Sequence, residues 1–271
     1  MLTPIFLKGG FSSYMKTNYN RCFICLLTLF LFISAISPLS AFASTDIPFS
    51  AEPWCHTMIF PEDEMVVPTT IIVYLPGAGH TGSDQDDLER FARANHPVKY
   101  SRENTIPMPD DCVIVCFQAH GEYDFRKKSD ELCEVIHALS ASCPEAKVIL
   151  AGHSNGALAT YKIAAANNPD IDGYVFISGT QIEGSEKLSL IPNCLVVYGY
   201  ESLIACRRDF SNLFYNTDIT DEKYREEISY VEEVTNNAYF VSKKWNHSTA
   251  PEIFQEDFFW EWVSNVTPLT E

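Results

Sequence analysis

Short apolar runs alternate along the chain with segments in which apolar residues recur at helical spacing. The runs are rich in β-branched and aromatic residues, and continuously apolar strands are what a parallel sheet covered on both faces requires. This pattern predicts an α/β domain with a doubly wound, mostly parallel sheet. The predicted buried strands span residues 69–75, 113–118, 147–151, 173–178, 194–198 and 238–242.

Helical spacing occupies most of the segments between these strands. The predicted helices span residues 86–94, 129–139, 157–167, 222–233 and 253–263. One more strand is predicted at 54–60, and we interpret residues 62–67, flanked by Pro61 and Pro68, as a hairpin connection. No internal repeat or long linker follows, so residues 44–271 are expected to form a single domain.

The first 43 residues have a different composition from the rest. They carry three basic residues and no acidic one, and residues 22–36 are almost entirely apolar. Pro38 breaks this run, and Ala41-Phe42-Ala43 has small residues where signal peptidase accepts them. We expect a secretory signal peptide at 1–43, cleaved before Ser44, and a secreted or periplasmic protein. The alternative is an uncleaved membrane anchor, because the apolar stretch approaches the ~20 residues of a membrane span.

The charge balance argues against nucleic acid and anionic lipid as partners. The 271 residues include 19 basic and 36 acidic side chains, which gives a net charge of −17. Removing 43 residues with three basic and no acidic side chains leaves 228 residues with a net charge of −20. Nonspecific binding to nucleic acid or anionic lipid requires clustered Lys and Arg, so we expect neither a nucleic-acid partner nor a membrane partner beyond the possible N-terminal anchor.

The cysteines give little evidence for a metal site. Seven of the nine follow residue 43, and an odd number in an oxidising compartment leaves at least one thiol unpaired in a monomer. Cys112 and Cys116 lie four residues apart on a predicted strand, about 13 Å from each other, which is too far for a disulfide. No His or Cys spacing after residue 43 is typical of zinc ligands, so no metal is expected.

The most informative stretch is KVILAGHSNGALATYKIAA, residues 147–165. A predicted buried strand leads into Gly152-His153-Ser154-Asn155-Gly156, which has the G-x-S-x-G pattern, and a predicted helix follows at once. A nucleophilic serine in such a turn stands at the carboxyl end of its strand, and the glycines let strand and helix pass without a clash. Here the chain resembles the α/β-hydrolase superfamily, from Thr69 to near its C-terminus, as a serine esterase or lipase-like member.

The resemblance implies a catalytic triad in the order serine, acid, histidine. His247 is the only histidine that follows Ser154 in the sequence, and it comes just after the last predicted strand. The resemblance therefore implies that Ser154 is the nucleophile and that His247 is the general base.

The acid of the triad departs from the usual pattern. Members of the superfamily usually carry an Asp about three residues after a glycine that ends the strand before the histidine strand. In this sequence Gly199 is followed at that place by Ser202, with Glu201 one residue earlier. Glu201 is the first candidate, Asp209 the second, and Glu183, after the preceding strand, the third.

The loop after the first buried strand, PGAGHTG at 76–82, offers two interpretations. In a hydrolase, a backbone N–H of this loop binds the oxyanion together with that of the residue after the nucleophile, which implies Ala78, with Gly79 as its alternate, and Asn155. The same letters fit the dinucleotide fingerprint G-x-G-x-x-G. That interpretation needs an acidic residue about 20 positions on at a strand end, but Glu103 lies in a polar, proline-containing stretch.

These features together predict an exported serine hydrolase that cleaves a carboxylic ester through an acyl-enzyme on Ser154, with an amide or a thioester as the less favoured alternatives. No cofactor is expected. Only residues 180–192 separate two core strands, so we expect a small lid or none, and a small or medium acyl-ester substrate. The alternatives are a hydrolase-fold binding protein with weak catalysis, favoured by the irregular acid position, and an exported NAD-binding oxidoreductase.

Overall fold

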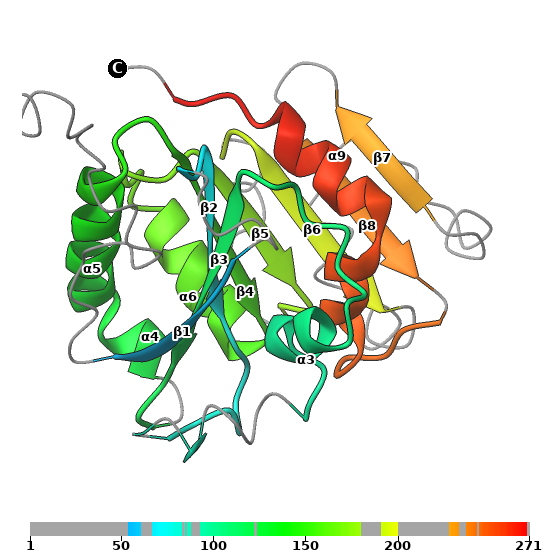
Figure 1. Cartoon of the computed structure of the whole chain (residues 1–271), viewed down its shortest axis with the longest axis horizontal. Coiled ribbons are helices and arrows are strands. Elements are labelled where there is room, and N and C mark those ends of the chain that lie inside the picture. Colours follow the sequence, from blue (N-terminus) through cyan, green and yellow to red (C-terminus); the bar gives the residue numbers. More distant parts are fainter. Residues whose placement is uncertain are drawn as a thin grey trace, which may run out of the picture. The chain divides into compact units, whose positions relative to one another are not determined.

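All six predicted buried strands are confirmed in the computed structural model of the chain (Figure 1). The additional N-terminal strand is confirmed as well, and one strand near residue 230 was not expected. The strands are β1 (Cys55–Ile59), β2 (Thr70–Leu75), β3 (Cys112–Gln118), β4 (Lys147–His153), β5 (Gly173–Ile177), β6 (Cys194–Gly199), β7 (Ile228–Glu232) and β8 (Asn237–Ser242).

The structure describes residues 54–60, 67–82, 84, 86–87, 93–121, 124–179, 191–199, 228–232, 237–242 and 244–269. All of these residues belong to one of the two units into which the chain divides, Thr45–Glu271. The described helices are α3 (Pro97–Arg102), α4 (Asp124–Lys127), α5 (Ser129–Ser142), α6 (Asn155–Ala164), the 3-10 helix η3 (Ala250–Gln255) and α9 (Asp257–Asn265).

The described strands form one eight-stranded sheet in the order β1-β3-β2-β4-β5-β6-β8-β7. The six inner strands, β3, β2, β4, β5, β6 and β8, run parallel to one another. At the two edges, β1 and β7 each pair antiparallel with their neighbour. The predicted doubly wound, mostly parallel sheet is therefore confirmed. From β2 the chain passes to β3 on one side and then to β4 on the other. Ligands of such sheets bind at the carboxyl ends of the strands where this reversal occurs.

The two faces of the sheet carry separate hydrophobic cores, because alternate residues of a strand point to opposite faces. Ile71 and Val73 of β2 pack with the buried side chains of α5 and α6. Ile72 and Tyr74 pack with those of α3, η3 and α9 on the other face. Figure 1 shows this layering, with α5 and α6 on one side of the strands and α3 and α9 on the other.

The predicted hairpin after the first strand is wrong. β1 pairs with β3 instead of β2, with Cys55 opposite Gln118 and Ile59 opposite Ile114. β2 already has a parallel neighbour on each side, β3 and β4, so no edge of β2 remains for β1. Local turn signals thus identified a chain reversal but not the pairing partner of the strand.

The predicted helix at 222–233 is also wrong over its described part. Residues 228–232 form β7, which pairs antiparallel with β8 at the sheet edge. The charged residues before it suggested a helix, but the described part, ISYVE, is rich in the β-branched and aromatic residues that favour strands.

The remaining helix predictions have mixed outcomes. α5 and α6 confirm the helices predicted at 129–139 and 157–167. The single helix predicted at 253–263 is two helices, η3 and α9, because Glu256 between them is extended. Helix α3 was not predicted. Of the helix expected at 86–94, only Asp86, Asp87, Arg93 and Ala94 lie within the described residues, and only the first two are helical. The prediction of a small lid or none rests on residues 180–192, almost all of which lie outside the described residues.

Candidate active site

Ser154 stands at the turn between β4 and α6, at the carboxyl edge of the sheet (Figure 1). Its backbone has φ 52° and ψ −112°, a conformation that costs a non-glycine residue of order 1–3 kcal/mol. Two hydrogen bonds hold the turn, from the Ser154 N–H to the Ile177 carbonyl at 2.8 Å and from the Leu158 N–H to the Ser154 carbonyl at 3.1 Å. The Ser154 hydroxyl does not cap α6, so it is available for another partner.

The two glycines of the motif are required by the close approach of strand and helix. A Cβ on Gly152 would lie 2.3 Å from the carbonyl oxygen of Gly156. A Cβ on Gly156 would lie 2.0 Å from the carbonyl oxygen of Leu75 at the end of β2. Both distances are far inside van der Waals contact, so any side chain here would push the nucleophile turn out of place.

His247 meets Ser154 across 93 residues of sequence. It lies in the loop after β8, and its Nε2 is 3.0 Å from the Ser154 Oγ, a hydrogen-bonding distance. Burial lowers the pKa of His247 below its ordinary value of 6.5. The imidazole is therefore largely neutral near pH 7, which is the state that can accept a proton from a hydroxyl.

The loop that carries His247 is held by its own polar side chains. The Asn246 carboxamide oxygen accepts hydrogen bonds from the N–H groups of Ser248 at 2.8 Å and Thr249 at 3.1 Å. The Thr249 hydroxyl accepts one in return from the Asn246 N–H at 2.8 Å. Side chains that close such turns fix the local backbone, so the position of the imidazole rests on an ordered loop.

The loop after β2 lies directly against the nucleophile turn. A Cβ built on Gly77 would be 3.0 Å from the Cβ of Ser154. Ala78 and Asn155 line one cavity of about 10 Å³, which has room for about one water molecule. Gly79, the alternate to Ala78, is not among the residues that line it. No described group accepts a hydrogen bond from the N–H of Ala78 or of Asn155.

The candidate acids Glu201, Asp209 and Glu183 all lie outside the described residues. Within the described part of the chain, no carboxylate lies at hydrogen-bonding distance from Nδ1 of His247, the ring nitrogen that a triad acid would bind. The structure thus brings together the predicted nucleophile, base and oxyanion loop.

Sequence reasoning missed one residue of this site, His153. Its Nε2 lies 2.8 Å from the backbone carbonyl oxygen of His247. The sequence offers one signal for it, which is its place next to the nucleophile. No pattern links its side chain to a loop 94 residues away.

The described residues give little support for a dinucleotide site, a metal site or a membrane-spanning helix. Glu103, the acid that a dinucleotide site would need at a strand end, is the C-cap of α3. No group of three or more His, Cys, Asp or Glu in the described ranges is placed to hold a metal ion. No helix among them is both long enough and apolar enough to span a bilayer.

The described cysteine side chains form no disulfide with one another. These are the thiols of Cys112, Cys116, Cys133, Cys143 and Cys194. The prediction that Cys112 and Cys116 cannot bond to each other is confirmed, and both are buried in β3. Burial raises the pKa of both thiols far above the ordinary value, so neither is a reactive thiolate.

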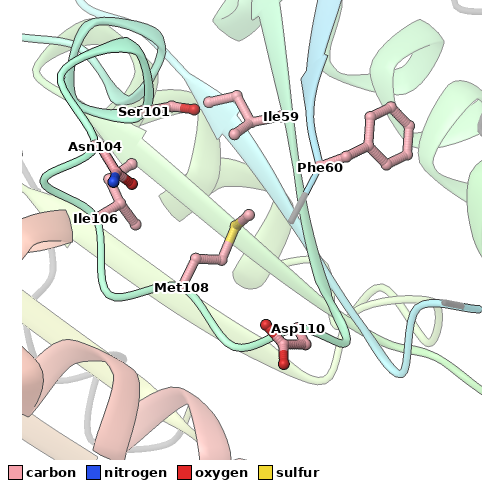
Figure 2. Close-up of a pocket in the computed structure, with 7 residues that line it drawn as sticks. All are labelled: Ile59, Phe60, Ser101, Asn104, Ile106, Met108 and Asp110. Carbon is pink, nitrogen blue, oxygen red and sulfur yellow. The ribbon is translucent and has the colours of Figure 1, made fainter. Parts of the chain in front are cut away.

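A larger cavity, of about 510 Å³, is lined by no residue of the nucleophile turn (Figure 2). Its lining comes from the end of β1, the end of α3 and the loop before β3, with Ile59, Ser101, Met108 and Asp110 among its residues. Because β1 runs antiparallel to β3, its last residue lies beside the start of β3. This cavity is therefore at the amino edge of the sheet, whereas the nucleophile turn is at the carboxyl edge.

Solved structures share this fold. The chain is similar to a dienelactone hydrolase from Anabaena variabilis, with 12% identity and a TM-score of 0.51 over 78% of this chain and 91% of that one. It is also similar to a thermostable esterase, with 14% identity and a TM-score of 0.50 over 77% of this chain and 58% of that one. No family model matches the sequence, and no curated protein matches it.

The first is named a hydrolase and the second an esterase. The likeness, together with the strand order and the nucleophile turn, shows that the chain has the α/β-hydrolase fold.

Proposed function

We propose that this protein is an exported serine hydrolase that cleaves carboxylic esters through an acyl-enzyme on Ser154. The observation that carries the proposal is the 3.0 Å distance between Ser154 Oγ and His247 Nε2, at a strained turn in a fold shared with esterases. A neutral imidazole at this distance from a hydroxyl that caps no helix is a nucleophile and base pair.

The reaction follows from this geometry. Ser154 Oγ attacks the ester carbonyl carbon while His247 Nε2 takes the hydroxyl proton, and the carbonyl oxygen becomes an oxyanion. The N–H groups of Ala78 and Asn155 stabilise that oxyanion in the small cavity between them. Collapse expels the alcohol, which receives the proton from His247.

Water then completes the cycle. It attacks the acyl-enzyme carbonyl and gives a proton to His247, the carboxylic acid leaves, and Ser154 Oγ regains the proton. Glu201 is our first candidate for the acid that orients the imidazole through Nδ1, with Asp209 and Glu183 after it. A large loss of kcat in Asp209→Asn but not in Glu201→Gln would refute this order.

Export rests on the sequence of the first 43 residues, which has a basic start, an apolar run and small residues before Ser44. Expression of the full chain with its leader in a bacterial host tests this part. We expect extracytoplasmic protein that begins at Ser44 by N-terminal sequencing. Protein that keeps Met1 and sediments with membranes would favour the anchored alternative.

Ester turnover tests the activity. We expect purified protein to hydrolyse p-nitrophenyl acetate and butyrate and to react with a fluorophosphonate, and Ser154→Ala to do neither while retaining the same melting temperature. Wild-type protein that neither turns over nor labels would sink the hydrolase proposal. It would leave a hydrolase-fold binding protein, which the irregular position of the candidate acid in the sequence favours.

A further inference from the structure

His153 is buried beside the nucleophile and makes an unusual contact. Only 7% of its surface is exposed, and its Nε2 lies 2.8 Å from the carbonyl oxygen of His247. A carbonyl oxygen can only accept, so Nε2 of His153 must carry the hydrogen and donate it. This fixes the tautomer of His153 and leaves Nδ1 as an acceptor.

The other ring nitrogen shows that packing alone does not account for this side chain. Nδ1 is buried and has no hydrogen-bond partner among the described residues. A buried polar atom without a partner costs about 1–3 kcal/mol. A Cβ built on Gly77 would lie 3.1 Å from this atom, so the oxyanion loop passes close to it. An apolar side chain of similar size would fill the same space without that cost.

The two neighbouring residues of the turn hold opposite ends of one residue. Ser154 contacts the imidazole of His247 through Oγ, and His153 contacts its main chain through Nε2. The rings of His153 and His247 are 5.2 Å apart between centroids. Residues 153 and 154 are covalently joined, so two adjacent residues of the nucleophile turn contact the backbone and the ring of His247.

We propose that His153 is a positioning residue, whose Nε2–H holds the backbone of His247 so that its imidazole stays within hydrogen-bonding reach of Ser154 Oγ. This inference rests on the proposed function and deepens it. The hydrogen bond acts on the main chain of the base, so it is separate from any acid that binds the ring at Nδ1.

The donor also stays in one protonation state. Burial lowers the pKa of His153 to about 3, so the ring is neutral throughout the range in which esterases are assayed. A neutral donor adds no charge beside the imidazolium that forms on His247 during the reaction. A lysine or arginine at this position would repel that cation.

Two substitutions separate the hydrogen bond from the bulk of the ring. His153→Gln keeps an N–H donor near the position of Nε2, whereas His153→Met is apolar and of similar size. We expect His153→Met to lose about 100-fold in kcat with KM changed less than about threefold, since a displacement of about 1 Å in a catalytic group costs this much. His153→Gln should recover to within about tenfold of wild type.

Either of two results would overturn the proposal. One is a His153→Met variant that melts like wild type and keeps its kcat, and the other is equal loss in both variants. If neither variant folds, 15N NMR of the wild-type imidazoles decides, because the proposal requires His153 to carry its proton on Nε2, and a proton on Nδ1 refutes it. A wild type that labels with fluorophosphonate keeps the proposed function standing whichever way these tests come out.

Discussion

The two edges of the sheet use polar residues in opposite ways. At the amino edge, Lys147 Nζ donates to the carbonyl oxygens of Val263, Ser264 and Val266 at the end of α9, at 2.8–3.2 Å. At the carboxyl edge, Ser154 and Ser178 have positive φ, and the buried hydroxyl of Ser178 has no partner among the described residues. Positive φ also occurs at Asn193 beside the amino edge, but asparagine adopts this conformation more readily than serine, so the strain is greater at the carboxyl edge.

Asp172 and Asn193 extend the same pattern at the amino edge. The carboxylate of Asp172 accepts hydrogen bonds from the N–H groups of Val148 at 2.8 Å and Leu269 at 2.9 Å. The Asn193 amide donates to the Asp172 and Thr267 carbonyls at 2.7 and 2.9 Å. The difference teaches that side-chain hydrogen bonds anchor the amino ends of the strands, while the carboxyl ends accept strain where chemistry requires it.

The largest expected effect tests the carboxyl edge as a site of chemistry. His247→Ala should lower kcat for p-nitrophenyl acetate by about 10³-fold or more, because the nucleophile loses its general base. Its melting temperature should stay within a few degrees of wild type. Equal activity in the variant would mean that the 3.0 Å contact with Ser154 has no catalytic role.

Low pH should lower the free energy of unfolding, because buried histidines near the carboxyl edge are held neutral. Burial lowers the pKa of His96 and His153 to about 3, from an ordinary 6.5. Below pH 6.5 the unfolded chain binds these protons first, so the free energy of unfolding is highest above 6.5 and falls as the pH drops toward 3. Urea unfolding at pH 7, 6, 5 and 4 should show a loss of about 1 kcal/mol per pH unit for each histidine.

His96→Asn provides the matched control for this slope. The His96 Nδ1 accepts a hydrogen bond from the Val98 N–H at the start of α3, and Asn supplies an oxygen in the same place. The variant keeps the cap and removes one titrating group, so its slope should be shallower by about 1 kcal/mol per pH unit. An unchanged slope would show that His96 is not among the groups responsible.

The amino edge should respond in stability and not in rate. Asp172→Ala removes the acceptor of two backbone N–H groups and should lower the free energy of unfolding by about 2 kcal/mol, with kcat unchanged. Asp170→Ala is the control, because among the described residues the Asp170 carboxylate pairs with an exposed His137, and such pairs contribute about 0–1 kcal/mol. Equal losses in the two variants would mean that the hydrogen bonds of Asp172 stabilise the amino edge no more than an exposed ion pair does.

The smallest effect concerns an unpartnered hydroxyl. Ser178→Ala should leave stability unchanged or raise it by less than about 1 kcal/mol, since it removes a buried polar atom that bonds to no described group. Thr160→Val should instead cost about 1 kcal/mol, because the buried Thr160 hydroxyl donates to the Gly156 carbonyl at 3.0 Å. Thermal unfolding of both variants measures the difference, and a clear loss in Ser178→Ala would contradict it.

Much of the fold could be predicted from local pattern because buried parallel strands are apolar along their whole length. The pairings at the two edges could not. β1 pairs with β3 and β7 with β8 through backbone hydrogen bonds that no side-chain pattern specifies. An edge strand has only one strand neighbour, so its sequence carries a weaker signal.

Features of the site likewise divide into those that the sequence predicts and those that it does not. Ser154 was predictable because its turn requires glycines at fixed spacing, and His247 because it alone among the histidines follows Ser154. The contact from His153 to the His247 backbone could not be predicted, since it depends on the path of a loop rather than on a residue type. Glu201, Asp209 and Glu183 stay predictions.

Mass mapping of a fluorophosphonate adduct, with its rate of formation, tests the central claim most directly. The claim is that Ser154 and His247 form a nucleophile and base pair. We expect one adduct per chain, on Ser154, which forms about 100-fold or more slowly in His247→Gln. An adduct on another residue, or equal rates in the two proteins, would contradict the account.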